Sequence, residues 1–152
     1  MAENGKKMIT INKRARFDYE ISETLEAGLV LQGTEVKSLR QGRVSLKDSY
    51  ADVQNGEIYL LHAHIEQYDQ GNRFNHDPER PRKLLLHRQE IRRLIGKTQE
   101  RGLTLIPTCV YFTRGKAKVE LGLAKGRKHY DKREVLKRRT AQRDIERALH
   151  DA

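Results

Sequence analysis

The chain has a single cysteine and no long hydrophobic run. One cysteine permits no disulfide within the chain and is typical of a reducing, cytoplasmic setting. The longest apolar stretches are far shorter than the roughly 20 residues that a membrane-spanning helix needs. Residues 1–15 also lack the apolar core of a signal peptide. We therefore expect a cytoplasmic protein without a membrane segment.

Recognisable catalytic motifs are also missing. There is no glycine-rich phosphate-binding loop, and the six histidines do not follow metalloprotease or zinc-finger spacing. His62 and His64 could share one face of a strand, so a metal site there is a minor alternative. Cys109 lies in the apolar run 105–111, which favours a buried, inert thiol over a nucleophile. We expect no enzymatic activity, no metal and no cofactor.

Positive charge is what the chain has in excess. It carries 31 Lys and Arg against 21 Asp and Glu, a net charge of +10 at pH 7. Ten of these cations, against four acids, lie between residues 125 and 147. The mean hydropathy of −0.85 is low for a fully globular chain. The pattern predicts a flexible N-terminus at 1–8, a compact body at 9–124 and a basic tail at 125–152. Its favoured partner is a polyanion, above all RNA.

Alternating apolar and polar residues predict short antiparallel strands in the body. We expect these strands at 9–11, 17–21, 25–31, 48–54, 57–62, 103–113 and 116–123. Residues 22–24 and 114–115 should turn the chain, and Asn55-Gly56 favours a type I′ hairpin. Pro107 indicates an edge or a bulge in its strand.

Two helices should interrupt the strands. The first is expected at 34–40 with Thr34 as its N-cap, and the second at 84–101 with Gly102 as its C-cap. Residues 66–82 are polar and should form a long, mobile, functional loop. The predicted fold is mainly β: an OB-like antiparallel six-stranded barrel with two or three helices and a basic C-terminal tail.

Three polar features have two interpretations each. The cations at 12–16 beside Phe17 are either a solvated strand end or an RNA contact. Glu26 is either solvated or an acceptor for base amino groups. The tail is either an unstructured solubilising segment or one that is disordered when free and becomes helical on RNA or in a ribosomal groove.

Six motifs in register resemble one bacterial family, small protein B (SmpB), the SsrA-binding proteins. They cover roughly residues 9–149 and read NKRAR at 12–16, EAG at 26–28, GTEVKSLR at 33–40, RKLLL at 82–86, GLAKG at 122–126 and DKR at 131–133. The resemblance implies an OB-like barrel that binds the tRNA-like domain of transfer-messenger RNA and delivers it to stalled ribosomes for trans-translation.

The resemblance also implies two sets of site residues. The expected RNA-binding residues are Asn12, Lys13, Arg14, Arg16, Phe17, Glu26, Gly28, Lys83, Leu85, His87 and Lys125. The tail, helical in the empty decoding site and message channel of the small subunit, should bind the ribosome through Lys128, His129, Tyr130, Asp131, Lys132, Arg133, Lys137, Arg138 and Arg139. Elongation factor Tu would join through the charged RNA, and the chain should be a monomer.

The chain departs from the family pattern at Phe17, His87 and Tyr130, where histidine, asparagine and histidine respectively are common. Stacking would survive at Phe17 and Tyr130, whereas the specific contact of His87 could differ. One alternative function is a structural ribosomal protein or general basic RNA-binding barrel. A second is an RNA-processing enzyme, which the absence of a recognisable set of acid and base residues opposes.

Overall fold

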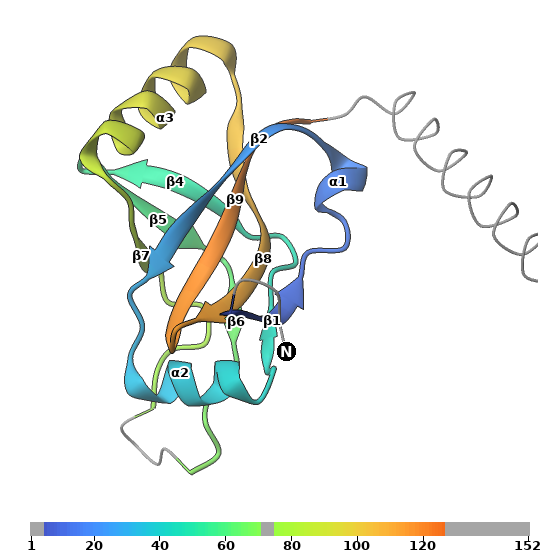
Figure 1. Cartoon of the computed structure of the whole chain (residues 1–152), viewed down its shortest axis with the longest axis vertical. Coiled ribbons are helices and arrows are strands. Elements are labelled where there is room, and N and C mark those ends of the chain that lie inside the picture. Colours follow the sequence, from blue (N-terminus) through green and yellow to red (C-terminus); the bar gives the residue numbers. More distant parts are fainter. Residues whose placement is uncertain (1–4, 71–74, 127–152) are drawn as a thin grey trace, which may run out of the picture.

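Six antiparallel strands close into a ring that forms the body of the protein (Figure 1). The computed structural model describes residues 5–70 and 75–126 of the chain. Around the ring the order is β8-β4-β5-β7-β2-β9, and β9 pairs with β8 to close it. The strands are β2 (Tyr19–Leu29), β4 (Tyr50–Gln54), β5 (Glu57–Leu61), β7 (Arg82–Leu85), β8 (Thr104–Thr113) and β9 (Lys116–Gly126). The predicted OB-like six-stranded barrel is confirmed.

Within the described residues, three further strands lie outside the ring. β3 (Val44–Ser45) pairs with β6 (His64–Ile65), and β1 (Lys6–Ile11) pairs with β8 beyond the point where β4 leaves it. β1 begins inside the segment 1–8 that was expected to be flexible. The backbone of β1 pairs with the edge of β8, and Lys6 lies opposite Thr113. Strand pairing, rather than a buried apolar face, therefore holds this polar sequence in place.

The described residues contain three helices, and two of them pack against opposite ends of the barrel. These helices are α1 (Ala15–Asp18), α2 (Gly33–Arg40) and α3 (Arg88–Arg101). Figure 1 shows α2 across one end and α3 at the other. Leu39 of α2 and Ile91 and Leu94 of α3 enter the same buried core as the inward side chains of the strands. Each helix is therefore held by its apolar stripe.

Both predicted hairpins form as the turn residues require. Asn55 and Gly56 have φ values of 52° and 77°, and Arg114 and Gly115 have values of 51° and 76°. Two consecutive positive φ angles define the type I′ turn, which matches the twist of the strands that it joins. The type I′ prediction at 55–56 is confirmed.

The start of β2 differs from the prediction in two ways. Phe17, expected in a strand, lies in α1, because Asn12 fastens this corner to β8: its backbone N–H donates to the Thr108 carbonyl (2.7 Å) and its side-chain amide to the Pro107 carbonyl (2.9 Å). Residues 22–24 were expected to turn, but β2 continues through them. A register shift between Ile21 and Glu23 inserts an extra residue, so the polar interruption is a β-bulge.

The starts of two helices also differ from the prediction. α2 is capped by Gln32 rather than by Thr34, since Glu35 accepts the Gln32 backbone N–H (2.8 Å). Leu84 was expected in the second helix but lies in β7, and α3 begins only at Arg88. Leu84 and Ile91 are both core residues. Their separation of seven residues matches a helical period by chance, although they belong to two different elements. The predicted C-cap is confirmed, because Gly102 has φ of 63°.

The long loop before β7 packs against the body where it is described. The Ile65 backbone N–H donates to the Pro78 carbonyl (2.9 Å), and His76 is 2% exposed. Arg82, placed in this loop by the sequence, is the first residue of β7. β9 extends to Gly126, so the paired part of the body reaches two residues beyond the expected boundary at 124.

Candidate nucleic-acid interface

A row of directly opposed residues crosses the outer face of five strands. It runs through Leu85, Gly28, Lys118, Tyr111 and Met8, on β7, β2, β9, β8 and β1 in turn. Directly opposed residues project from the same face of a sheet. The two ends of the row are apolar and exposed, because Leu85 is 56% and Met8 51% accessible.

Gly28 lets its two neighbours in this row approach each other. A Cβ at this position would lie 3.3 Å from the Leu85 Cβ and 3.7 Å from the Lys118 Nζ. With no side chain on β2, an apolar group and a cation therefore stand side by side on the outer face. That combination suits RNA, which offers flat apolar base faces next to phosphates.

Glu26 projects from the same face, one pair of residues away from Gly28. Glu26 is exposed, and its carboxylate accepts a hydrogen bond from the Tyr111 hydroxyl. Tyr111 itself is buried, with 3% of its surface exposed. Burial and then the hydrogen bond to Glu26 raise the pKa of Tyr111 well above its usual range. Tyr111 therefore keeps its proton and remains a donor, which holds the Glu26 carboxylate in one position. A fixed carboxylate can accept hydrogen bonds from base amino groups.

A second carboxylate, Glu120, lies directly opposite Glu26 on β9. Like charges placed this way repel each other, and the hydroxyl of Thr108 relieves the cost by donating to Glu120. The Cys109 sulfur lies 3.7 Å from the same carboxylate. Burial raises the pKa of the Cys109 thiol, so it stays protonated. The predicted burial of Cys109 is confirmed.

The basic corner at α1 holds another group of expected RNA-binding residues. Lys13, Arg14 and Arg16 are exposed, and the Arg14 guanidinium lies 5.2 Å from the Phe17 ring centroid. Lys125 is exposed and pairs with Glu20 on the neighbouring strand. A cleft of about 950 Å³ runs between this corner and residues 44–50. Asn12 differs from these cations, because its amide is bonded to Pro107.

The predicted RNA-binding residues therefore form two groups along β2. Lys125 pairs near the start of β2, opposite Glu20, whereas Leu85 pairs near its end, opposite Gly28. Eight residues of extended chain separate these points, or about 26 Å. A ligand that contacts both groups must span a distance of about this order.

Lys83, Leu85 and His87 lie where β7 leads into α3. The Lys83 Nζ is 4.0 Å from a carboxylate oxygen of Glu57, and His87 is the N-cap of α3. The His87 backbone N–H donates to the Glu90 side chain (3.1 Å). The His87 residue itself is exposed.

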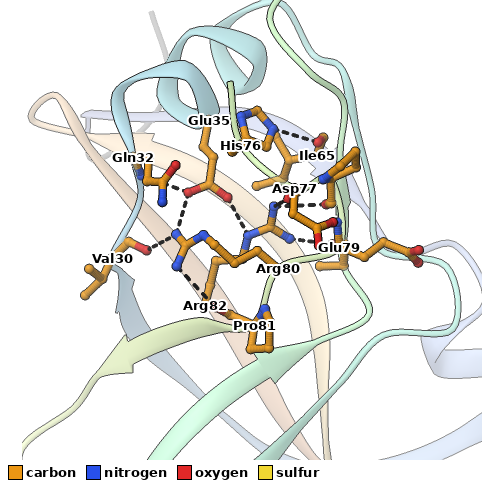
Figure 2. A network of polar contacts seen from close by, with 12 residues as sticks. Val30, Gln32, Glu35, Ile65, His76, Asp77, Glu79, Arg80, Pro81 and Arg82 are labelled. Atoms are coloured by element: carbon orange, nitrogen blue, oxygen red, sulfur yellow. Dashed lines mark hydrogen bonds and ion pairs between the residues drawn. The ribbon is translucent and has the colours of Figure 1, made fainter. Parts of the chain in front are cut away.

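A buried ion-pair network holds α2, β7 and the loop between β6 and β7 together (Figure 2). Glu35 and Arg82 are both fully buried, with the Arg82 Nε 2.6 Å from a Glu35 oxygen. Arg82 also donates to the carbonyls of Ala63 (2.5 Å) and Pro78 (2.9 Å). Arg80 bonds the other oxygen of Glu35 at 2.5 Å. The network fixes the path of the chain into β7, which carries Lys83 and Leu85.

The sequence did not identify four residues of this surface. Tyr111 and Lys118 join it through strand register, and Arg88 and Arg92 flank the groove near Leu85. Alternation along β9 places Lys118 on the face opposite Val119, which was a usable signal. Tyr111 gave none, because it lies within an almost continuous apolar run.

The rest of the predictions meet the structure only in part. The ribosome-binding residues of the tail, 128–139, lie outside the described residues. Within residues 5–70 and 75–126, no group of three or more His, Cys, Asp and Glu side chains could hold a metal ion. None of the helices in those ranges is long and apolar enough to cross a membrane.

Comparisons with known proteins agree with one another. The family model for SmpB protein matches residues 9–151. SsrA-binding proteins of Geobacillus thermodenitrificans and Moorella thermoacetica are 62% and 63% identical, over 99% and 95% of this chain and 97% and 94% of theirs. A chain in a solved structure described as "tmRNA-SmpB: a journey to the center of the bacterial ribosome" is 55% identical, covers 79% of this chain and 85% of its own, and superposes with a TM-score of 0.66.

Proposed function

The chain belongs to the SmpB protein family, and from this premise we propose that it binds the tRNA-like domain of transfer-messenger RNA and delivers it to stalled ribosomes for trans-translation. The observation that carries the proposal is the similarity to SsrA-binding proteins, which extends over 99% of this chain. The solved relative, described in a tmRNA-SmpB complex and the bacterial ribosome, supports the same partners.

The surface offers a physical basis for this binding. Glu26 provides a fixed acceptor, Leu85 an apolar face and Lys118 a cation within one patch of the barrel. The corner at α1 adds Lys13 and Arg14, and Lys125 pairs with β2 about 26 Å along the strand from Gly28. Two separated contact groups favour a large, shaped RNA over a short single strand, and a tRNA-like domain is long enough to touch both.

Further parts of the proposal concern partners and setting. The basic tail binds the decoding site and message channel of the small subunit, so a message already in the channel would compete with it. Elongation factor Tu takes part through the charged RNA, and the protein acts in the cytoplasm as a monomer. It works by recognition and charge and catalyses no reaction.

Competition binding at two salt concentrations tests the proposal. The full chain is titrated with a tRNA-like fragment of transfer-messenger RNA, and ordinary tRNA serves as the competitor. Binding through many phosphates should fall by ~10³-fold or more across a fourfold rise in salt. We expect a preference for the tRNA-like fragment to survive at high salt. Equal binding of both RNAs, lost together with salt, would instead identify a general basic RNA-binding protein.

A further inference from the structure

A groove runs along the N-terminal half of α3, on the side of Leu85 away from Gly28. It has a volume of about 570 Å³ and lies between α3, β7 and the tip of the β4–β5 hairpin. Its lining contains the buried Leu84 and Ile91 and the half-buried Leu86 and Ile95. The floor of the groove is therefore apolar and is formed by residues of the hydrophobic core.

Three cations surround this floor, against one acid. Lys83, Arg88 and Arg92 line the groove together with Glu57, which is 4.0 Å from Lys83. Arg88 and Arg92 are exposed and four residues apart, so they project from one side of α3. Neither forms an ion pair with any residue in the described part of the chain. The local field is positive and suits an anionic occupant.

The opposite side of α3 is different. Arg93 and Lys97 both bind the carboxylate of Glu23 on β2, with the Lys97 Nζ 3.3 Å from its oxygen. These two cations fasten the helix to the barrel. The helix thus carries two pairs of cations at the same spacing, one pair bound to Glu23 and the other facing the groove.

Leu85 connects the groove to the patch on the outer face that contains Glu26, Gly28 and Lys118. Its side chain lines the groove, and its Cβ would be 3.3 Å from a Cβ at Gly28. A nucleic acid that covers Glu26, Gly28 and Leu85 would reach the groove without a gap. Because the patch suits bases and the groove presents exposed guanidinium groups, the continuing strand would place phosphates there.

We propose that this groove holds the phosphate backbone of the bound RNA, with Arg88 and Arg92 as its two contacts. The inference rests on the proposed function for the identity of the RNA, and it adds α3 to the surface that binds it. The apolar floor packs against sugars and the guanidinium groups pair with phosphate oxygens.

The salt dependence of binding tests the role of the two arginines. Affinity of the full chain for the tRNA-like fragment is measured from 50 to 400 mM salt for wild type, R88Q/R92Q and R93Q/K97Q. Each lost phosphate contact lowers the slope of log K against log salt by ~0.7–0.9. We expect R88Q/R92Q to reduce the slope by about 1.4–1.8, so that its affinity deficit shrinks as salt rises.

R93Q/K97Q is the matched control, since it removes the same charge from the same helix. We expect its slope to stay close to that of wild type, and thermal melting is used to check that both variants fold. Equal slope changes in the two variants would mean that only net charge matters, and an unchanged slope for R88Q/R92Q would leave the groove to another partner such as an acidic peptide. Either result overturns the proposal. The competition with ordinary tRNA tests the proposed function separately. The salt slope reports phosphate contacts whether or not the protein prefers the tRNA-like fragment.

Discussion

Glu35 is the residue on which the buried network depends. It accepts hydrogen bonds from Arg80, Arg82 and the Gln32 backbone, and it has no exposed surface. Two buried charges stabilise a fold only weakly when paired, but removing one partner leaves the other without compensation. The network is therefore more important for fixing one path of the chain than for its net free energy.

Replacing Glu35 with alanine should lower the free energy of unfolding by ~3–5 kcal/mol, because it leaves Arg82 buried and unpaired. Urea denaturation of wild type and variant measures this change. Glu66→Ala is the control: Glu66 pairs with Arg43 at the surface (2.6 Å), where a pair contributes at most ~1 kcal/mol. Similar losses in both variants would contradict a special role for the buried pair.

The pKa of Glu35 makes the network sensitive to acid. Burial raises this pKa, but the hydrogen bonds from Arg80 and the Gln32 backbone and the charge of Arg82 outweigh burial, so the net pKa is lowered. A lowered folded pKa stabilises the protein above the unfolded value of about 4.3, and the stability is lost as pH falls through the folded value. The difference in unfolding free energy between wild type and Glu35→Gln should thus shrink from pH 5 to pH 2. A difference that stays constant over this range would show that the folded pKa is not lowered.

Glu26 should bind RNA despite its negative charge. Glu26→Ala removes an acceptor held by Tyr111, and we expect weaker binding of the tRNA-like fragment even though the protein becomes more basic. Filter binding at fixed salt measures the effect. The control is Glu66→Ala, which also removes one exposed acid but lies outside the residues assigned to the RNA surface. Tighter binding by Glu26→Ala would mean that Glu26 is only a solvated charge.

At the scale of elements, β2 depends on its bulge and on a close approach to β9. The bulge at Ser22 lets one strand bend past α1 and still pair with β9 over nearly its whole length. On the far side of the bulge, Gly122 of β9 meets Ile21. A Cβ at Gly122 would lie 2.9 Å from the Ile21 Cγ2, closer than packing allows. The glycine is needed there for space rather than for its backbone freedom.

Gly122→Ala should therefore cost ~1–3 kcal/mol of unfolding free energy through overpacking. The cost should largely vanish in an Ile21→Ala background, which clears the contact, and a double-mutant cycle from urea denaturation measures this coupling. Gly96→Ala is the opposite control, since nothing lies within 4 Å of its new Cβ in the α3 interior, and it should stabilise by ~0.5–1 kcal/mol. If the free-energy changes of the Gly122→Ala and Ile21→Ala substitutions simply add, steric contact with Ile21 is not the reason for the glycine.

At the scale of the whole molecule, the body and the tail should divide the work. Lys125 and Gly126 are paired with β2, so the paired part of the body reaches at least to 126. The segment 127–152 adds nine Lys and Arg against five acids. Its charge suits long-range attraction to RNA. Among the described residues, the candidate groups for reading RNA, Glu26 and Leu85, lie in the body.

Removing residues 127–152 should leave the preference for the tRNA-like fragment intact and abolish peptide tagging on stalled ribosomes. Competition binding and a tagging assay on a message without a stop codon measure the two activities. Parallel loss of both would contradict this division of labour. A truncation at 125 is a useful comparison, because it also removes the pairing of Lys125 and Gly126.

The sequence by itself determined the features that depend on neighbouring residues. Asn55-Gly56 fixed a type I′ turn through its φ angles, Gly102 ended α3, and alternation placed Val119, Leu121 and Leu123 on the buried face of β9. Only the tertiary structure decided what depends on residues distant in the chain. The Ser22 bulge, the Glu35–Arg82 pair and the Tyr111–Glu26 bond each join residues between roughly 47 and 101 positions apart. Local pattern carries no record of such partners, because only the packing of distant elements brings them together.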